Sequence, residues 1–137
     1  MRLLLKNAHL YRHQAFSDTD VLIEDGIIKE MASLITKEGE EVLDAAGLVV
    51  APGLIDTHVH FRDPGFTYKE TIHTGALASA KGGFTSVICM ANTSPTVDSV
   101  PVLKDNLSRA SKEKIRIFQA ASISCNLKGQ EETDMDA

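Results

Sequence analysis

The chain has 137 residues, and its 14 Lys and Arg against 19 Asp and Glu give a formal net charge of −5, which argues against a nucleic-acid-binding surface. Its apolar runs are far shorter than the ~20 residues that span a bilayer. The three leucines after Arg2 are too few for the apolar part of a secretory signal, and both cysteines lie in apolar stretches. We therefore expect a cytoplasmic protein that binds neither nucleic acid nor membrane and has no structural disulfide.

The first 52 residues are predicted to form a small β-rich segment. Apolar strings alternate with turn signals at residues 3–11, 21–32 and 40–52. Asp25-Gly26 stands between two β-branched runs, and this dipeptide favours a tight hairpin because glycine tolerates positive φ. The pattern predicts a mostly antiparallel sheet, with the charged residues 37–41 as a solvated loop.

Pro52-Gly53 marks a change of pattern, so we place a domain boundary there, between residues 1–52 and 53–137. Beyond it, predicted strands at 54–60, 85–90 and 115–123 alternate with predicted helices at 69–81 and 100–111. Apolar strands joined by helices are typical of an α/β fold with a parallel sheet, in which functional residues lie on the loops after the strands.

The sharpest local feature is the pair His58 and His60 at the end of the first strand beyond this boundary. Residues i and i+2 of a strand share a face, so both imidazoles can reach one zinc-like ion. Five histidines in this length give roughly 0.2 such pairs by chance. An isolated pair is therefore more often structural than metal-binding, and the neighbouring residues must show which of the two applies here.

Two nearby residues favour a binding site. Arg62, in the turn formed by residues 61–65, offers a planar guanidinium for a carboxylate; the alternative is a solvated arginine paired with Asp63 or another acid. Asn92 follows the next strand and can bind a substrate through its amide; the alternative is that it only forms the turn. A metal with these two side chains would make a pocket for a small acidic amide.

At these residues the sequence resembles a known family. The stretches APGLIDTHVHFRDPG (51–65) and KETIHTGALASAKGGFTSVICMANTSPTVD (69–98) are similar to the N-terminal part of dihydroorotases, which are metal-dependent amidohydrolases. The resemblance implies a partial (β/α)8 barrel, of which this chain holds the first three strands, preceded by part of a small β-sandwich. It implies zinc, often as a binuclear pair, with His58 and His60 as metal ligands and Arg62 and Asn92 as contacts of the substrate carboxylate.

The reaction implied is the reversible cyclisation of N-carbamoyl-L-aspartate to dihydroorotate in pyrimidine biosynthesis. A complete barrel takes roughly 250 residues, so we expect a fragment that is inactive alone and lacks the further ligands and the general base. A homodimer or a complex with a carbamoyltransferase is a possible assembly of the full protein. The family commonly has proline where this chain has Ala91, and alanine leaves the loop that presents Asn92 less rigid.

Two other functions stay open. A hydantoinase or allantoinase relative shares the histidine pair, but its substrates lack the ring carboxylate that Arg62 would bind. A non-catalytic scaffold homologue would be expected to lose metal ligands, and the presence of His58 and His60 argues against it. We interpret the other histidines and both cysteines as structural residues.

Overall fold

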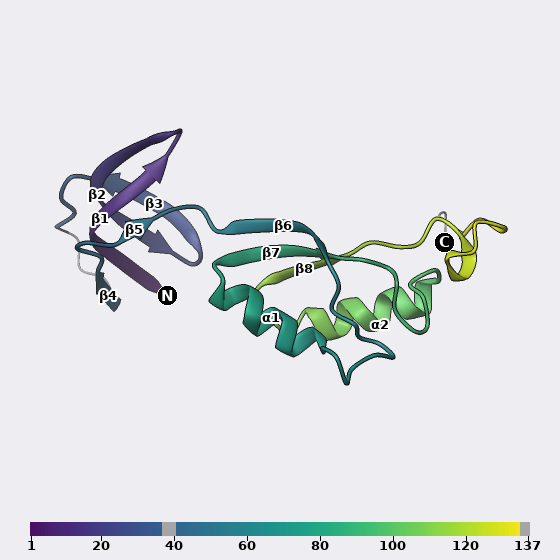
Figure 1. Cartoon of the computed structure of the whole chain (residues 1–137). Coiled ribbons are helices and arrows are strands. Elements are labelled where there is room, and N and C mark those ends of the chain that lie inside the picture. Colours follow the sequence, from purple (N-terminus) through teal and green to yellow (C-terminus); the bar gives the residue numbers. More distant parts are fainter. Residues whose placement is uncertain (37–40, 135–137) are drawn as a thin grey trace. The chain divides into compact units, whose positions relative to one another are not determined.

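The structure, a computed structural model, describes residues 1–36 and 41–134. It has mixed α/β secondary structure, as the sequence predicts, and it divides into two compact units, Met1–Pro52 and Gly53–Ala137. Each unit has its own sheet (Figure 1). Across the described ranges, no helix has the length and apolar character needed to cross a membrane.

The first unit is a five-stranded sheet with the order β3-β2-β1-β4, and β5 also pairs with β1. Its strands are β1 (Arg2–Arg12), β2 (Ala15–Glu24), β3 (Ile27–Ala32), β4 (Glu41–Asp44) and β5 (Val49–Val50). The prediction of a mostly antiparallel sheet is only half right, because β4 and β5 run parallel to β1. Of the charged run, residues 37–40 lie outside the described residues, and Glu41 begins a strand instead of continuing a loop.

Two hairpins build the antiparallel half of this sheet. The predicted hairpin between β2 and β3 is confirmed, with φ of 50° at Asp25 and 76° at Gly26. The hairpin between β1 and β2 turns at His13 and Gln14, whose φ angles are 51° and 62°. The sequence did not reveal this second turn because it lacks glycine, and because residues 17–20 of β2 are all polar.

A buried carboxylate ties this sheet to the segment after β3. Asp20 is 3% exposed and accepts hydrogen bonds from the backbone N–H groups of Ile35, at 3.0 Å, and Asn7, at 2.9 Å. These two hydrogen bonds lower the pKa of Asp20, with a further contribution from the charge of Lys6, and they outweigh the opposing effect of burial.

The second unit is a parallel sheet with the order β6-β7-β8. Its strands are β6 (Leu54–Val59), β7 (Phe84–Cys89) and β8 (Arg116–Gln119), joined by α1 (Ile72–Lys81) and α2 (Val100–Ala110), and a 3₁₀ turn (Cys125–Leu127) follows. Both helices lie on the same side of the sheet (Figure 1). Helix α1 starts later than predicted because Thr71 caps it: the side chains and backbone N–H groups of Thr71 and Thr74 bind each other reciprocally.

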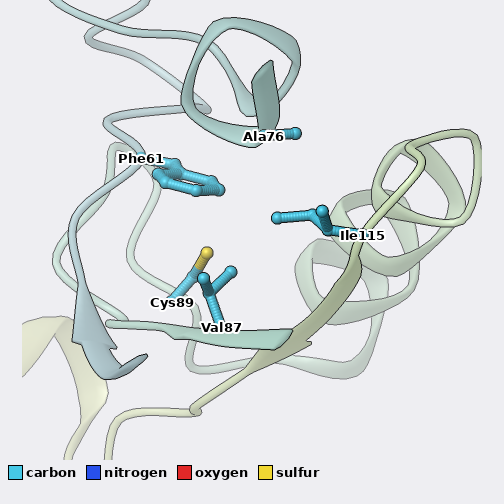
Figure 2. Close-up of a cluster of buried hydrophobic side chains, with 5 residues drawn as sticks. All are labelled: Phe61, Ala76, Val87, Cys89 and Ile115. Carbon is cyan, nitrogen blue, oxygen red and sulfur yellow. The ribbon is translucent and has the colours of Figure 1, made fainter. Parts of the chain in front are cut away.

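The core of this unit lies between the sheet and the helices. Figure 2 shows its five buried side chains, Phe61, Ala76, Val87, Cys89 and Ile115, gathered in that space. Gly75 of α1 lies against the ring of Phe61 so closely that a Cβ atom there would stand 2.4 Å from a ring carbon. The helix can approach the sheet at this depth because residue 75 has no side chain.

Candidate metal and substrate site

The two histidines lie on the side of β6 away from the core. Val59 and Phe61 pack into the core, and side chains alternate along an extended chain, so His58 and His60 project to the opposite face. Their ring centroids are 5.0 Å apart and the ring planes meet at 66°. His58 is exposed and His60 is half-buried, so the pair is accessible to a ligand.

These rings border an open hollow at the ends of the three strands, which we call the strand-end hollow. It is lined by His58 of β6 and by residues of the segments that follow β6, β7 and β8, among them His60, Asn92 and Ser122. Carboxyl ends of parallel strands meet at one edge of a sheet, which explains why residues far apart in the sequence share this surface.

Asn92 contacts His60 directly. Its Oδ1 atom lies 2.7 Å from Nδ1 of His60. A carbonyl oxygen can only accept, so Nδ1 of the imidazole carries a proton and donates; in the neutral ring this leaves the lone pair on Nε2. A hydrogen bond of this kind fixes the tautomer and orientation of a metal-binding histidine.

Arg62 is placed differently from the other three candidates. It is partly buried, it is not among the residues that line the strand-end hollow, and within residues 1–36 and 41–134 its side chain makes no hydrogen bond or ion pair. The turn that carries it is tied to the loop after β7 through the N–H of Ser94, which donates to the carbonyl of Pro64 at 3.1 Å. Gly65 permits this approach, with φ of 92° and the Ser94 carbonyl where a Cβ would be.

Asp63, the acid next to Arg62, is bound by other groups. Its carboxylate forms an ion pair with Arg109 of α2, and it also accepts a hydrogen bond from the backbone N–H of Ile72 at 3.1 Å. Arg109 also contacts Asp105 at 2.9 Å. Burial opposes the charge of Arg109, but its contacts with these two carboxylates outweigh burial and raise its pKa.

Polar contacts continue from Arg109 to the ends of β7 and β8. Arg109 Nη2 donates to Oδ1 of Asn106 at 2.8 Å, and Asn106 Nδ2 lies 3.4 Å from Oε1 of Gln119. Gln119 Nε2 in turn donates to the carbonyls of Cys89, at 3.1 Å, and Ala120, at 3.0 Å. The sequence analysis did not predict this network. The one feature that could have indicated it is that Asn106 and Arg109, three residues apart, share a face of a predicted helix.

Two of the three remaining histidines form contacts with nearby acids. His9 and His73 contact Asp18 and Glu113, at 2.7 and 3.1 Å. Both cysteines are free thiols. The pKa of Cys89 is raised to about 12, and burial is the main cause. This thiol therefore stays protonated and unreactive near neutral pH.

The donors present fit part of a zinc site. A neutral imidazole nitrogen is a preferred zinc ligand, and in the neutral ring of His60 the hydrogen bond to Asn92 places that nitrogen at Nε2. A zinc site takes at least three protein ligands, and the described residues contain no group of three His, Cys, Asp or Glu side chains that could hold a metal. His58 and His60 are therefore a pair that needs further ligands from elsewhere.

Comparison with known proteins gives consistent matches. A family model described as Dihydro-orotase-like matches residues 47–137. The dihydroorotase of Streptococcus pneumoniae serotype 4 is 54% identical over 137 residues, which are 98% of this chain and 32% of that protein. The dihydroorotase of Streptococcus pyogenes serotype M3 is 47% identical with the same coverage. The chain thus spans 32% of the length of the curated relatives it matches.

Solved structures match the fold. L-hydantoinase (dihydropyrimidinase) from Arthrobacter aurescens has a TM-score of 0.79 at 22% identity, over 89% of this chain and 28% of that one. A D-hydantoinase structure has a TM-score of 0.71 at 30% identity, and the match covers 90% of this chain and 28% of that one. The fold and these sequence and structure matches together place the chain in the class of amidohydrolases. Within that class, the chain belongs to the dihydroorotase-like family, which confirms the resemblance seen in the sequence motifs.

Proposed function

We propose that this chain is the N-terminal part of a zinc-dependent dihydroorotase, which interconverts N-carbamoyl-L-aspartate and dihydroorotate in pyrimidine biosynthesis. The observation that carries the proposal is the contact between His60 and Asn92 beside His58, in a chain 54% identical to a named dihydroorotase. These side chains come from the ends of two neighbouring parallel strands, the location at which active sites of (β/α)8 enzymes are built.

The proposed architecture extends both units. Strands β6, β7 and β8 are the first three of a (β/α)8 barrel, and residues 1–52 are part of a small β-sandwich. Exposed apolar residues on both sheets support this, because such surfaces are normally covered: Phe118 is 54% and Val49 62% exposed. By itself the chain is expected to be inactive, since two imidazoles are too few ligands for a catalytic zinc ion. A cytoplasmic location and assembly as a homodimer or with a carbamoyltransferase stay predictions.

The residues of this chain have distinct proposed tasks. His58 and His60 hold zinc, which when bound makes hydroxide available near neutral pH. Asn92 orients the ring of His60 and presents its remaining amide N–H groups to the substrate. Arg62 binds the substrate carboxylate as a planar, permanently charged partner, and its freedom from other ion pairs in the described residues supports that task.

A chimaera tests this function. The chain replaces the matching third of the Streptococcus pneumoniae dihydroorotase, and the purified protein is assayed with dihydroorotate, hydantoin and allantoin. We expect turnover of dihydroorotate alone, because only that ring carries a carboxylate for Arg62. Preference for either neutral ring would favour a hydantoinase or allantoinase instead. A stably folded chimaera without zinc and without turnover would favour a non-catalytic scaffold.

A further inference from the structure

Gln119, the last residue of β8, joins the ends of β7 and β8 through its side-chain amide. It lies opposite Cys89 in the register of the two strands and shares a face with Ile117, which packs against the core, so its side chain is on the helical side of the sheet. Its Nε2 atom lies 3.1 Å from the carbonyl oxygen of Cys89, 3.0 Å from that of Ala120 and 3.4 Å from that of Met90. The amide thus binds the backbone where both chains leave the sheet.

Helix α2 sets the direction of this amide. A guanidinium can only donate, so the atom of Asn106 that faces Nη2 of Arg109, at 2.8 Å, is the acceptor Oδ1. The Nδ2 group of Asn106 then points to Oε1 of Gln119, at 3.4 Å, and Nε2 of Gln119 is left to face the three carbonyls. Asn106 is 2% exposed, so water has little access to these contacts.

The carbonyls on β7 stand directly before the segment that carries Asn92. Met90 is held from both neighbouring strands, because its N–H donates to the carbonyl of Val59 at 2.9 Å and its own carbonyl faces the amide of Gln119. Ala91 follows, and alanine does not restrict φ as proline would. The direction in which the chain enters the turn at Asn92 therefore depends on the contacts of the backbone before it.

We infer that Gln119 is a positioning residue, which holds the backbone before Asn92 and thereby maintains the contact between Asn92 and His60. The inference rests on the proposed function, in which this contact orients a zinc ligand. Gln119 itself is not among the residues that line the strand-end hollow, so it touches neither the zinc nor the substrate proposed to bind there. A hydrogen bond weakens steeply as its geometry departs from the optimum, so a small displacement of Asn92 is enough to loosen the ring of His60.

A contact that only stabilised the fold would behave differently. In that case, loss of the amide lowers the free energy of unfolding and leaves the zinc affinity of the folded protein unchanged. If Gln119 acts through Asn92, its loss also lowers the zinc affinity, but only while the side chain of Asn92 is present. Prior removal of that side chain should therefore abolish the effect, since two residues that act through one contact are not additive.

The test measures the zinc affinity of the chimaera, by competition with a chelator, in four variants: Gln119→Met, Asn92→Ala, the double variant, and Gln130→Met as a control that makes the same substitution at an exposed glutamine. Methionine is close to glutamine in length and has no N–H group. We expect Gln119→Met to weaken zinc binding about three- to tenfold, less than Asn92→Ala, because hydrogen bonds to the carbonyl of Ala91 still hold the loop. The double variant should bind zinc within about twofold of Asn92→Ala alone, and the Gln130→Met control should match the parent.

Three results would overturn the inference. These are unchanged zinc affinity in folded Gln119→Met, unchanged zinc affinity in Asn92→Ala, or a double variant in which the two losses multiply. Thermal unfolding of each variant measures its folding separately. If Gln119→Met does not fold, Gln119→Glu with and without Asn92→Ala repeats the comparison, because glutamate keeps an acceptor for Asn106 and lacks the N–H groups. A parent chimaera without zinc and without turnover would instead overturn the proposed function, and this inference with it.

Discussion

Nδ1 of His60 donates a hydrogen bond to Oδ1 of Asn92 across the ends of β6 and β7, with 2.7 Å between the two atoms. This contact joins the second histidine of the H-x-H pair to the first polar residue after the next strand. It gives Asn92 a task besides the substrate contact proposed for it, since the imidazole is held with Nε2 free. The two tasks can be separated by experiment.

Replacing Asn92 by alanine is expected to weaken zinc binding of the chimaera about 10- to 100-fold, because the ring of His60 loses its orienting partner. Competition with a chelator of known affinity measures this change. Thr93→Ala is the matched control, since Thr93 donates to the Pro95 carbonyl and does not touch His60. Unchanged zinc affinity with a raised KM would leave Asn92 with the substrate role alone.

Removal of either proposed zinc ligand should abolish dihydroorotate turnover by the chimaera. His58→Ala and His60→Ala are each expected to lower the zinc content below that of the parent, because each removes one of the few neutral nitrogen donors. Elemental analysis after dialysis measures it. His73→Ala is the control, as His73 contacts Glu113 on the helical side of the second unit. Full zinc occupancy in both ligand variants would refute the assignment.

Gly75→Ala should destabilise the second unit. Alanine gains about 0.5–1 kcal/mol over glycine within a helix, but the new Cβ would stand 2.4 Å from the Phe61 ring, and overpacking costs about 1–3 kcal/mol. We expect a net loss of about 1 kcal/mol in the free energy of unfolding, measured by denaturant titration. Gly82→Ala is the control: φ is −80° there, and the nearest contact of its Cβ is 3.4 Å. A gain of stability at position 75 would contradict the close approach of Gly75 to the Phe61 ring.

Asp20 should make the stability of the first unit depend on acid. Its pKa is lower in the folded chain than the unfolded value of about 3.9. Its contribution is therefore fully present above that value and is lost as the pH falls through the lowered folded pKa. Asp20→Asn should cost about 2 kcal/mol at neutral pH and flatten this acid dependence. Unfolding curves between neutral and acidic pH test this, with the exposed Asp18→Asn as control.

The two thiols should differ in reactivity. Cys89 is buried and its pKa is raised to about 12, whereas Cys125 is partly exposed. Iodoacetamide at pH 8 should therefore label Cys125 in the folded chimaera and leave Cys89 unmodified until denaturant is added. Peptide mass spectrometry distinguishes the sites. Rapid labelling of Cys89 in the native protein would show that the core around it opens.

Much of this protein is determined locally by its sequence. The Asp25-Gly26 hairpin, the alternation of strands and helices beyond residue 53, and the placement of His58 and His60 on one face all follow from short-range rules: turn dihedrals, helical periodicity and the two-residue repeat of a strand. The motifs around the histidines also sufficed to identify the family, because they are contiguous in the chain.

Only the tertiary structure decided which side chains contact one another at the site. That Asp63 binds Arg109 and leaves Arg62 unpaired, and that Asn92 contacts His60, depends on residues 46 and 32 positions apart in the chain. Local propensities carry no information about such pairs, since the contacts form only when α2 and the loop after β7 come together with the segment after β6. The pairing of β4 and β5 with β1 is equally non-local, because a parallel ladder needs a crossover whose course is fixed by packing and not by a turn dipeptide.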